Sequence, residues 1–411
     1  MQMNIEWIIL MNNFKIPKIR FMNFNDKWKY KILGEISNSI EYGLNASAKD
    51  FDGIHKYLRI TDIDDSSRLF LTDKLSSPDV NFTEEDYENY KLQINDLLFA
   101  RTGASVGKTY LHRESDGEVY FAGFLIRARL HDSYDGNFIF QQTLTDKYKQ
   151  FIEITSQRSG QPGVNGKEYG DWKIGMTSYP EQSAIGSLFR TLDDLLANYK
   201  DNLTNYQSLK ATMISKMFPK AGQTVPEIRL DGFEGEWENK ILSEVTNITM
   251  GQSPKSENYT DNPNDYILVQ GNADIKDKQV VPRLWTTEVT KTAEIGDIIL
   301  TVRAPVGDIG KTDYNVVIGR GVAAIKGNDF IFYTLEKMKM TGFWNRFSTG
   351  STFESISSND IKEAIIQIPT LKEQQAIGSY FSNLDNLINS HQEKISQLET
   401  LKKKLLQDMF I

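Results

Sequence analysis

Cysteine is absent from this chain of 411 residues, and histidine is scarce. Without thiols the chain cannot form disulfides, zinc sites with thiolate ligands or cysteine nucleophiles, and the absence fits a reducing compartment. No apolar run is long enough to span a bilayer, and the short run at 5–11 lacks the basic residues that precede a signal peptide. The four histidines, which do not have the spacing of metal ligands, are His55, His112, His131 and His391. We therefore expect a cytoplasmic protein with no membrane segment and no metal site.

The charge balance restricts the function further. The net charge of −8 at pH 7 argues weakly against a protein that binds nucleic acid by itself. Any DNA-binding role must therefore rest on local surfaces or on a basic partner. No serine–histidine pair and no pair of carboxylates stands out as catalytic, so the sequence indicates no active site.

One stretch of the chain occurs twice. Residues 181–218 and 373–410 align at a fixed offset of 192 without a gap, and 14 of the 38 positions are identical. Chance would give about two or three matches. Both copies repeat apolar residues at steps of three and four, the spacing of helices that pack along a seam. The sequence therefore predicts two long helices that form an antiparallel coiled coil, with seam residues that include Ile185, Phe189, Leu192, Ile377, Phe381 and Leu384.

The duplication extends to the sequence before each helix. Each copy has a short buried-strand pattern, at 94–98 and 295–299. An arginine and a loop that ends in Gly-Lys-Thr follow, at 101–109 and 303–312. At an offset of 209, Pro17, Arg20 and Trp28 recur as Pro226, Arg229 and Trp237. Because the repeated sequence begins only at Pro17, either Met1 or Met11 could be the natural start.

The repeat predicts a fold class and a domain organisation. We expect two α/β (α+β) domains in tandem, separated by the two long antiparallel helices and related by an internal pseudo-two-fold axis. The expected boundaries are a first domain at 1–177, a helix at 178–218, a linker at 219–225, a second domain at 226–369 and a helix at 370–411. The middle parts of the two domains share little sequence, which indicates one architecture with two different binding surfaces.

Two local patterns are incomplete versions of known sites. Residues 103–109 are one residue short of a phosphate-binding P-loop, and residues 307–312 are two short. Residues 262–266 resemble the Asn-Pro-Pro-Tyr box of amino-methyltransferases, but the second proline is missing. We therefore favour strand-edge turns whose arginine and lysine suit phosphate or base-edge contacts. The polar loops at 156–161 and 348–352 are also rich in hydrogen-bond donors, although ordinary surface loops have the same composition.

Together these features resemble the specificity subunit of type I restriction–modification enzymes. The resemblance rests on the duplication, on the Glu-Gln-x-Ala-Ile-Gly openings at 181–186 and 373–378, and on the segments at 17–28 and 226–237. The strand that begins with Asp and leads to an arginine and a glycine-bearing loop is also similar. The resemblance covers essentially the full length, except for the residues before Pro17 and the less regular stretch at 21–24.

The resemblance implies a DNA reader that is not itself an enzyme. Each target recognition domain would bind one half of a bipartite, asymmetric site in double-stranded DNA, and the helical pair would set the spacing between the halves. Two DNA adenine methyltransferase (M) subunits would dock on the chain, and motor–nuclease (R) subunits would join them in a host-defence complex. S-adenosylmethionine and ATP/Mg would belong to those partners, so no cofactor is expected in this chain. The net negative charge fits a complex in which the M subunits supply much of the phosphate contact.

The predicted DNA contacts are loop residues that can donate hydrogen bonds. They are Arg101, Thr102, Lys108, Gln157, Arg158, Arg303, Lys311, Thr349, Ser351 and Thr352. The six seam residues named above are predicted to form the helix seam and the subunit-docking surface. The alternative is a coiled-coil protein scaffold with two ligand-binding domains and no DNA role, which leaves the duplicated basic loops without a reason. A methyltransferase or nuclease is opposed by the missing motifs. Neither half-site sequence nor the gap between them can be deduced from these residues.

Overall fold

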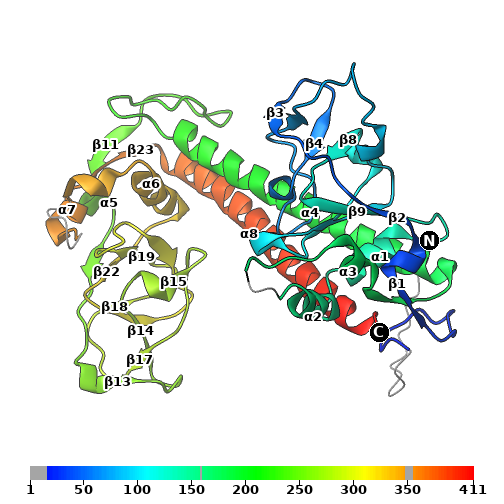
Figure 1. Ribbon diagram of the computed structural model, residues 1–411. Helices are drawn as coiled ribbons and strands as arrows, with labels where there is room; N and C mark the ends of the chain where they lie inside the picture. Colours follow the sequence, from blue (N-terminus) through cyan, green and yellow to red (C-terminus); the bar gives the residue numbers. More distant parts are fainter. Residues whose placement is uncertain (1–15, 158–159, 348–354) are drawn as a thin grey trace. The chain divides into compact units, whose positions relative to one another are not determined.

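Two long helices connect the parts of the chain in the computed structural model, which describes residues 16–157, 160–347 and 355–411. Helix α4 spans Tyr179–Met217 and helix α8 spans Leu371–Asp408 (Figure 1). The chain divides into two compact units, which we call unit 1 (Met1–Asp201 with Gln392–Ile411) and unit 2 (Asn202–His391). Each long helix therefore contributes one half to each unit and does not form a separate domain. No helix in the described ranges is long and apolar enough to cross a membrane.

Unit 1 is built on a four-stranded sheet in the order β2-β9-β6-β7. The two-stranded ladders β1–β10, β3–β5 and the parallel β4–β8 surround it. Its strands are β1 (Lys29–Ile32), β2 (Ser37–Tyr42), β3 (Ala48–Asp50), β4 (Lys56–Leu58), β5 (Ser76–Pro78), β6 (Asp96–Ala100), β7 (Thr109–Leu111), β8 (Val119–Phe121), β9 (Leu125–Leu130) and β10 (Lys173–Met176). Its short helices are α1 (Gly136–Gln142), α2 (Asp146–Thr155) and α3 (Gly166–Gly170).

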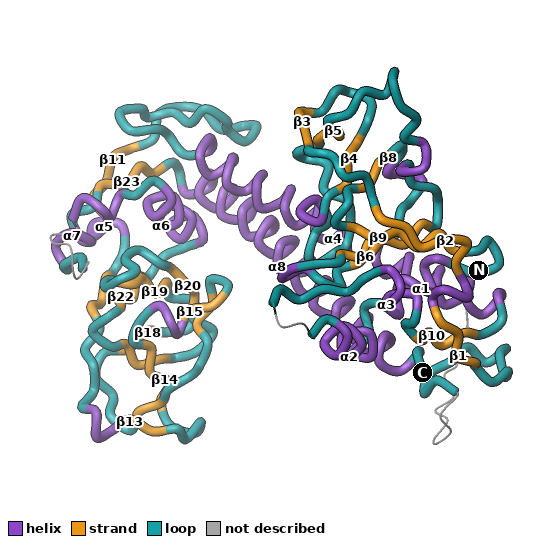
Figure 2. The backbone as a smooth tube through the Cα atoms, in the orientation of Figure 1, coloured by secondary structure: helices purple, strands orange, loops and turns teal. Residues whose placement is uncertain are grey.

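Unit 2 contains a six-stranded sheet, β12-β22-β19-β20-β16-β15, and a five-stranded sheet, β13-β17-β14-β21-β18 (Figure 2). The pair β11–β23 is separate. The strands are β11 (Glu238–Ile241), β12 (Ile248–Met250), β13 (Tyr259–Thr260), β14 (Tyr266–Val269), β15 (Ile275–Lys276), β16 (Gln279–Val280), β17 (Trp285–Thr286), β18 (Thr292–Ala293), β19 (Ile298–Thr301), β20 (Ile309–Lys311), β21 (Val316–Ile318), β22 (Val322–Ile325) and β23 (Ile365–Ile368). The helices are α5 (Leu242–Val245), α6 (Asp329–Met340) and α7 (Ser358–Lys362).

The two long helices pack antiparallel within each unit, as the sequence predicts. In unit 1, the rings of Phe189 and Phe410 lie 5.7 Å apart and Lys200 binds Glu399 at 2.8 Å. In unit 2, Tyr206 contacts His391 and Phe218 contacts Phe381, with ring centroids 5.2 and 6.0 Å apart. In both units the residue number on α8 falls as the number on α4 rises, which defines the antiparallel orientation.

Each unit has its own apolar core, centred on a duplicated tryptophan. Trp28 is fully buried in unit 1, and Trp237 is 2% exposed in unit 2. The core of unit 1 takes in the start of α4 and the end of α8, and the core of unit 2 takes in the end of α4 and the start of α8. The long helices are therefore held by tertiary packing as well as by their own pairing.

The motif that opens each long helix forms the joint between the helix and its unit. Arg20 binds both carboxylate oxygens of Glu181, at 2.6 and 2.7 Å, from a buried position. The equivalent Arg229 binds Glu373 at 2.8 and 2.7 Å. The paired N–H groups of a guanidinium fit the two oxygens of a carboxylate, so this pair fixes orientation as well as distance. The recurrence of these arginines thus has a structural explanation.

The glycine of the same motif allows a close crossing. A Cβ at Gly186 would lie 2.3 Å from Oδ1 of Asp135, which caps helix α1. A Cβ at Gly378 would lie 2.7 Å from Cβ of Asp329, the first residue of α6. The long helix and the shorter helix can approach this closely only where the long helix lacks a side chain.

Candidate functional site

The predicted contact residues Arg101 and Thr102 follow directly after strand β6, next to a loop that is distant in sequence. Thr102 forms a β-bridge with Gly163, and the backbone N–H of Val164 donates to the carbonyl of Arg101 at 2.9 Å. The loop that carries Gln157 is thereby held beside the Arg101 loop. In unit 2, Arg303 forms the matching bridge with Ser355. Arg158, Thr349, Ser351 and Thr352 lie outside the described residues, so their predicted roles stay predictions.

The guanidinium of Arg101 lies between two aromatic rings. Its Cζ is 5.1 Å from the ring centre of Tyr42 and 5.8 Å from that of Phe124. Its Nε is buried and has no hydrogen-bond acceptor among the described residues. Cation–π contacts orient a guanidinium without using its N–H donors. Arg101 is therefore positioned and still able to donate, and neither Tyr42 nor Phe124 was among the residues predicted from the sequence.

Arg303 is exposed, and no ion pair joins it to an acid in the part of unit 2 that the structure describes. The β-bridge to Ser355 fixes its backbone, while its side chain remains free to reach an outside group. Arg303 therefore has the exposure that a contact residue requires.

The two lysines of the Gly-Lys-Thr loops have internal partners. Lys108 is 8% exposed and binds Asp65 at 2.7 Å, beside a groove of about 870 Å³ in unit 1. Lys311 pairs with Asp329 and lies 5.4 Å from the ring centre of Phe332. The carboxylate neutralises part of the charge that each lysine could offer to an outside phosphate, although an ammonium group retains further N–H donors.

The structural register differs from the sequence alignment of these loops. In β6–β7, Leu97 pairs with Leu111, and in β19–β20 the equivalent Ile298 pairs with Lys311. Lys311 is therefore equivalent to Leu111 and not to Lys108. The shared bridge position likewise makes Arg303 equivalent to Thr102 and not to Arg101. The two units carry their cations at different places on the same scaffold.

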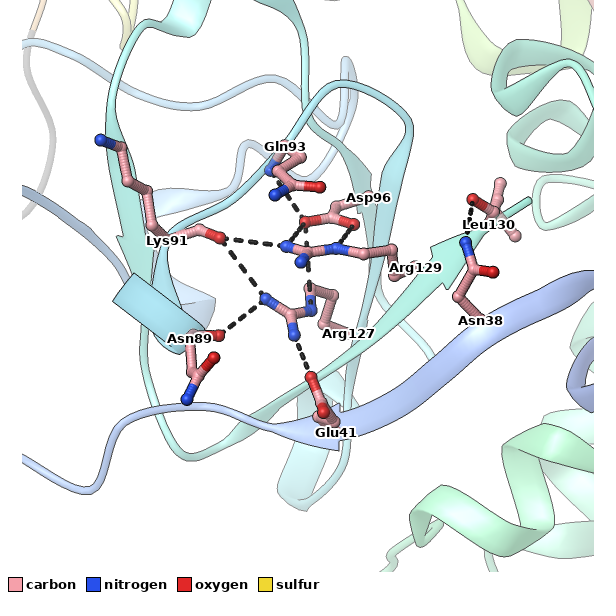
Figure 3. A network of polar contacts seen from close by, with 9 residues as sticks. All are labelled: Asn38, Glu41, Asn89, Lys91, Gln93, Asp96, Arg127, Arg129 and Leu130. Atoms are coloured by element: carbon pink, nitrogen blue, oxygen red, sulfur yellow. Dashed lines mark hydrogen bonds and ion pairs between the residues drawn. The ribbon is translucent and has the colours of Figure 1, made fainter. Parts of the chain in front are cut away.

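A charge network holds the sheet that carries Arg101 and Tyr42 (Figure 3). Arg129 on β9 binds both oxygens of the buried Asp96 on β6, at 3.0 and 2.9 Å. Arg127, which is 1% exposed, pairs with Glu41 of β2 and donates to the carbonyl of Asn89 at 2.9 Å. The network thus connects β2, β6 and β9 through side chains, in addition to their backbone ladder. In unit 2 the equivalent Asp297 forms an ion pair with a lysine, Lys326, at 3.3 Å.

The predicted seam residues lie inside the helical pair. Their exposure is between 0% and 7% for Ile185, Phe189, Leu192, Ile377, Phe381 and Leu384. They line the cores of units 1 and 2, so none of them presents a surface to another subunit. Any docking surface on these helices must use other residues.

Comparison with known proteins shows which proteins this chain resembles. Residues 234–400 match the family model described as the type I restriction modification DNA specificity domain. A Methanocaldococcus jannaschii protein named as the type I restriction enzyme MjaX specificity subunit is 27% identical over 96% of this chain and 95% of its own. The chain is thus similar to type I restriction enzyme specificity subunits over almost its whole length. The MjaVIII specificity subunit of the same organism is 20% identical, over 97% of this chain and 96% of its own.

Solved structures of specificity subunits share the fold. The S subunit of a type I restriction–modification system from M. genitalium aligns with a TM-score of 0.67 at 16% identity, over 96% of this chain and 99% of that one. A chain from a study of complex assembly and conformational transition in a type I R-M system aligns with a TM-score of 0.51 at 22% identity, over 92% of this chain and 96% of that one. The predicted fold of two tandem α/β domains with long helices is thereby confirmed.

Proposed function

We propose that this specificity subunit reads a bipartite, asymmetric DNA sequence, one half-site with each unit, and performs no catalysis itself. The observation that carries this proposal is a duplicated scaffold whose equivalent positions present different side chains. Thr102 in unit 1 corresponds to Arg303 in unit 2, and Lys108 corresponds to a position without a lysine. One scaffold with two sets of hydrogen-bond donors is suited to two different half-site sequences.

The helical pair supports the second part of the proposal, which is a fixed spacing between the half-sites. Each long helix is continuous over 39 or 38 residues and is anchored in both units. A helix rises about 1.5 Å per residue and resists compression, so the pair can serve as a spacer. The length of the gap in the DNA follows from this spacer together with the docking of each unit on the double helix.

Two copies of a DNA adenine methyltransferase subunit are the proposed partners, and motor–nuclease subunits join them for cleavage. S-adenosylmethionine and ATP/Mg belong to these partners in this proposal. The net charge of −8 supports a division of labour in which the partners supply much of the phosphate contact. Salt dependence of DNA binding should then be steep for the complex and shallow for the chain alone.

Exposed leucines on the long helices supply a docking surface that the buried seam cannot. Most of the identities between the two helices are buried, but Leu195 and Leu209 are 40% and 41% exposed. Their duplicates, Leu387 and Leu401, are 42% and 44% exposed. Packing within the chain does not account for an apolar residue kept on the surface in both copies. Contact with two identical copies of a partner does account for it.

The ion pairs place these leucines at matching levels along the two helices. In unit 1, Leu195 lies between Asp193 and Lys200, whose partners on α8 are Lys402 and Glu399. Leu401 lies between those two partners, so it is opposite Leu195. By the same argument Leu209 is opposite Leu387 in unit 2, between the contacts of Tyr206 and Lys210. Each unit thus offers one leucine pair to one partner copy.

The decisive experiment maps DNA methylation. The full chain is co-expressed with the methyltransferase subunit of its own system in a host that lacks such an enzyme, and N6-methyladenine is located throughout the genome. We expect one asymmetric two-part motif with a fixed gap. A stable complex that leaves no sequence-specific mark would contradict the proposal and favour the protein scaffold.

The variant Arg303→Ala tests whether each unit reads its own half-site. If Arg303 reads a base, the variant should relax one position of one half-site and leave the other half-site unchanged. If it contacts only phosphate, methylation should weaken evenly across all sites. Relaxation in both half-sites at once would contradict the assignment of one unit to each half.

A further inference from the structure

Each unit contains the same short turn between two strands. In unit 1 it is residues 122–124, between β8 and β9, and in unit 2 it is residues 319–321, between β21 and β22. Five backbone hydrogen bonds hold each turn, and they join equivalent positions in the two units. In unit 1 the backbone N–H donor and the carbonyl acceptor of each bond are, in that order, Gly43 and Leu125, Leu44 and Phe121, Ala122 and Leu58, Leu125 and Ala122, and Arg101 and Phe124. In unit 2 the equivalent donors and acceptors are Gly251 and Val322, Gln252 and Ile318, Gly319 and Val269, Val322 and Gly319, and Val302 and Gly321.

A glycine packs directly against each turn. A Cβ at Gly43, which follows β2, would lie 2.2 Å from the carbonyl oxygen of Ala122. A Cβ at Gly251, which follows β12, would lie 2.1 Å from the carbonyl oxygen of Gly319. Neither position has room for a side chain, so the backbone of the turn is fixed by contacts that are the same in both units.

The side chains on this common backbone differ. In unit 1 the turn ends in Phe124, which is 61% exposed, and Gly123 precedes it. In unit 2 the equivalent of Gly123 is Arg320, which is exposed between two glycines. Single exposed apolar or charged residues are common on protein surfaces. Here, however, the exposed residue changes between two copies that share these five backbone hydrogen bonds. One bond differs, because the N–H of Gly123 donates to the carbonyl of Leu44 whereas that of Arg320 donates to Oγ of Ser253.

The surroundings of each turn leave hydrogen-bond donors without acceptors. In unit 1, Phe124 lies against the guanidinium of Arg101, whose buried Nε is unpaired. In unit 2, no ion pair joins Arg320 to an acid in the described ranges. The backbone of Gln270 lies against Gly321, and its buried Nε2 is also unpaired. Neither of these two buried nitrogens has an acceptor among the described residues, so no hydrogen bond from them fixes its side chain to the rest of the unit.

We propose that these two turns are base-reading elements, with Phe124 and Arg320 each reading a base of one half-site. This inference rests on the proposed function and assigns it to particular residues. An exposed guanidinium on a rigid turn suits the O6 and N7 acceptors of guanine in the major groove. An exposed phenyl ring, held by a cation on one side, suits the methyl group of thymine. Phe124 therefore reads a thymine-containing pair, and Arg320 reads a guanine-containing pair.

The test is methylation mapping with variants of the full chain, in complex with its methyltransferase subunit. Phe124→Ala should relax one position of one half-site, and Arg320→Ala should relax one position of the other. Discrimination at that position should fall by about tenfold or more, the range for one base contact. Phe124→Leu keeps an apolar contact and should fall less. The matched controls are Ile54→Ala in unit 1 and Tyr266→Ala in unit 2, which change residues that are 66% and 56% exposed.

The outcomes separate this inference from the proposed function. If the wild-type complex gives no two-part motif, the proposed function itself fails. If the wild type gives the motif and both variants keep it unchanged, the proposed function stands and the base-reading turns are wrong. Evenly weakened methylation at every site would also overturn the inference, because it indicates phosphate contact. Thermal unfolding of each variant, expected to match the wild type, shows that lost discrimination does not come from lost folding.

Discussion

Lys210 on α4 binds both carboxylate oxygens of Asp385 on α8, at 2.6 and 2.7 Å, and their duplicates Lys402 and Asp193 meet at 2.5 Å. The lysine of each copy of the helix thus pairs with the aspartate of the other copy. Such reciprocal contacts are typical of two-fold symmetric association between identical chains. Here a single chain provides both copies, and each reciprocal pair lies within one unit.

The two lysines should differ in their effect on stability. Lys210 is 6% exposed and also binds Glu336 at 3.1 Å, and burial lowers its pKa. Lys210→Met leaves Asp385 and Glu336 with less compensating charge, and we expect a loss of about 3–5 kcal/mol in the free energy of unfolding of unit 2. Lys402→Met is the matched control, because Lys402 is 18% exposed and, among the described residues, forms an ion pair with Asp193 alone. We expect a loss of about 1–3 kcal/mol there. Urea denaturation measures both, and equal losses would contradict the difference in burial.

The close helix crossing predicts sensitivity to a single methyl group. Gly186→Ala places a Cβ against Oδ1 of Asp135, so the long helix or α1 must move. We expect a loss of about 1–3 kcal/mol from this overpacking. Ser187→Ala, at the exposed neighbouring position, should change stability by less than about 0.5 kcal/mol. A tolerated Gly186→Ala, measured by thermal unfolding, would show that the crossing can relax.

A buried histidine should make unit 1 sensitive to acid. His112 is 5% exposed, and its burial lowers its pKa, although Asp116 and Asp96 act in the opposite direction. Below a pH of about 6.5 the unfolded chain binds a proton that the folded chain excludes. The free energy of unfolding therefore falls as pH decreases through that value, and the full contribution is present above it.

The variant His112→Thr isolates this effect. Thr312 occupies the equivalent position of unit 2, as the matching bonds from His112 to Asp96 and from Thr312 to Asp297 show. Denaturation of wild type and variant at about pH 7.5 and pH 5.5 compares their slopes. We expect the variant to lose less stability on acidification. The same pH dependence in both proteins would exclude His112 as the source.

The leucine pairs should each control one partner copy. Leu195→Glu combined with Leu401→Glu should weaken docking at unit 1 by about tenfold or more, and Leu209→Glu with Leu387→Glu should do the same at unit 2. Mass measurement of the assembled complex should then show one methyltransferase copy in place of two. Gln207→Glu, on an exposed position of the same helix, serves as the control. Two bound copies in both double variants would place docking elsewhere.

The long helices could be predicted from the sequence because their seam repeats over many turns. The predicted seam and the antiparallel pairing both follow from that period. The strands were harder to predict because most are only two to six residues long and pair across large sequence separations. Val280, for example, ends β16, although the apolar Val281 follows it. A short apolar run does not show where its hydrogen-bonded partner ends.

The predicted contact residues were placed with mixed accuracy, for a physical reason. Arg101 and Arg303 lie on strand-edge turns, as expected. Lys108 and Lys311 share a Gly-Lys-Thr sequence but not a structural position, because the loops between the equivalent paired strands differ in length. Phe124 and Arg320 were not predicted, because the sequence at each turn shows only glycines before an apolar strand. Gly123-Phe124 and the Gly-Arg-Gly at 319–321, aligned with each other, were the available indication.

The turns on β8–β9 and β21–β22 have a consequence for evolution. The five hydrogen bonds that the two turns share all come from the backbone, and the N–H of Arg320 also donates to Oγ of Ser253. None of these bonds uses the side chain of the exposed residue. A mutation at Phe124 or Arg320 therefore changes the exposed side chain without disturbing the backbone of the turn. A lineage can vary these positions while the protein remains folded. If the turns read bases as proposed, a single substitution at either position is enough to change the half-site.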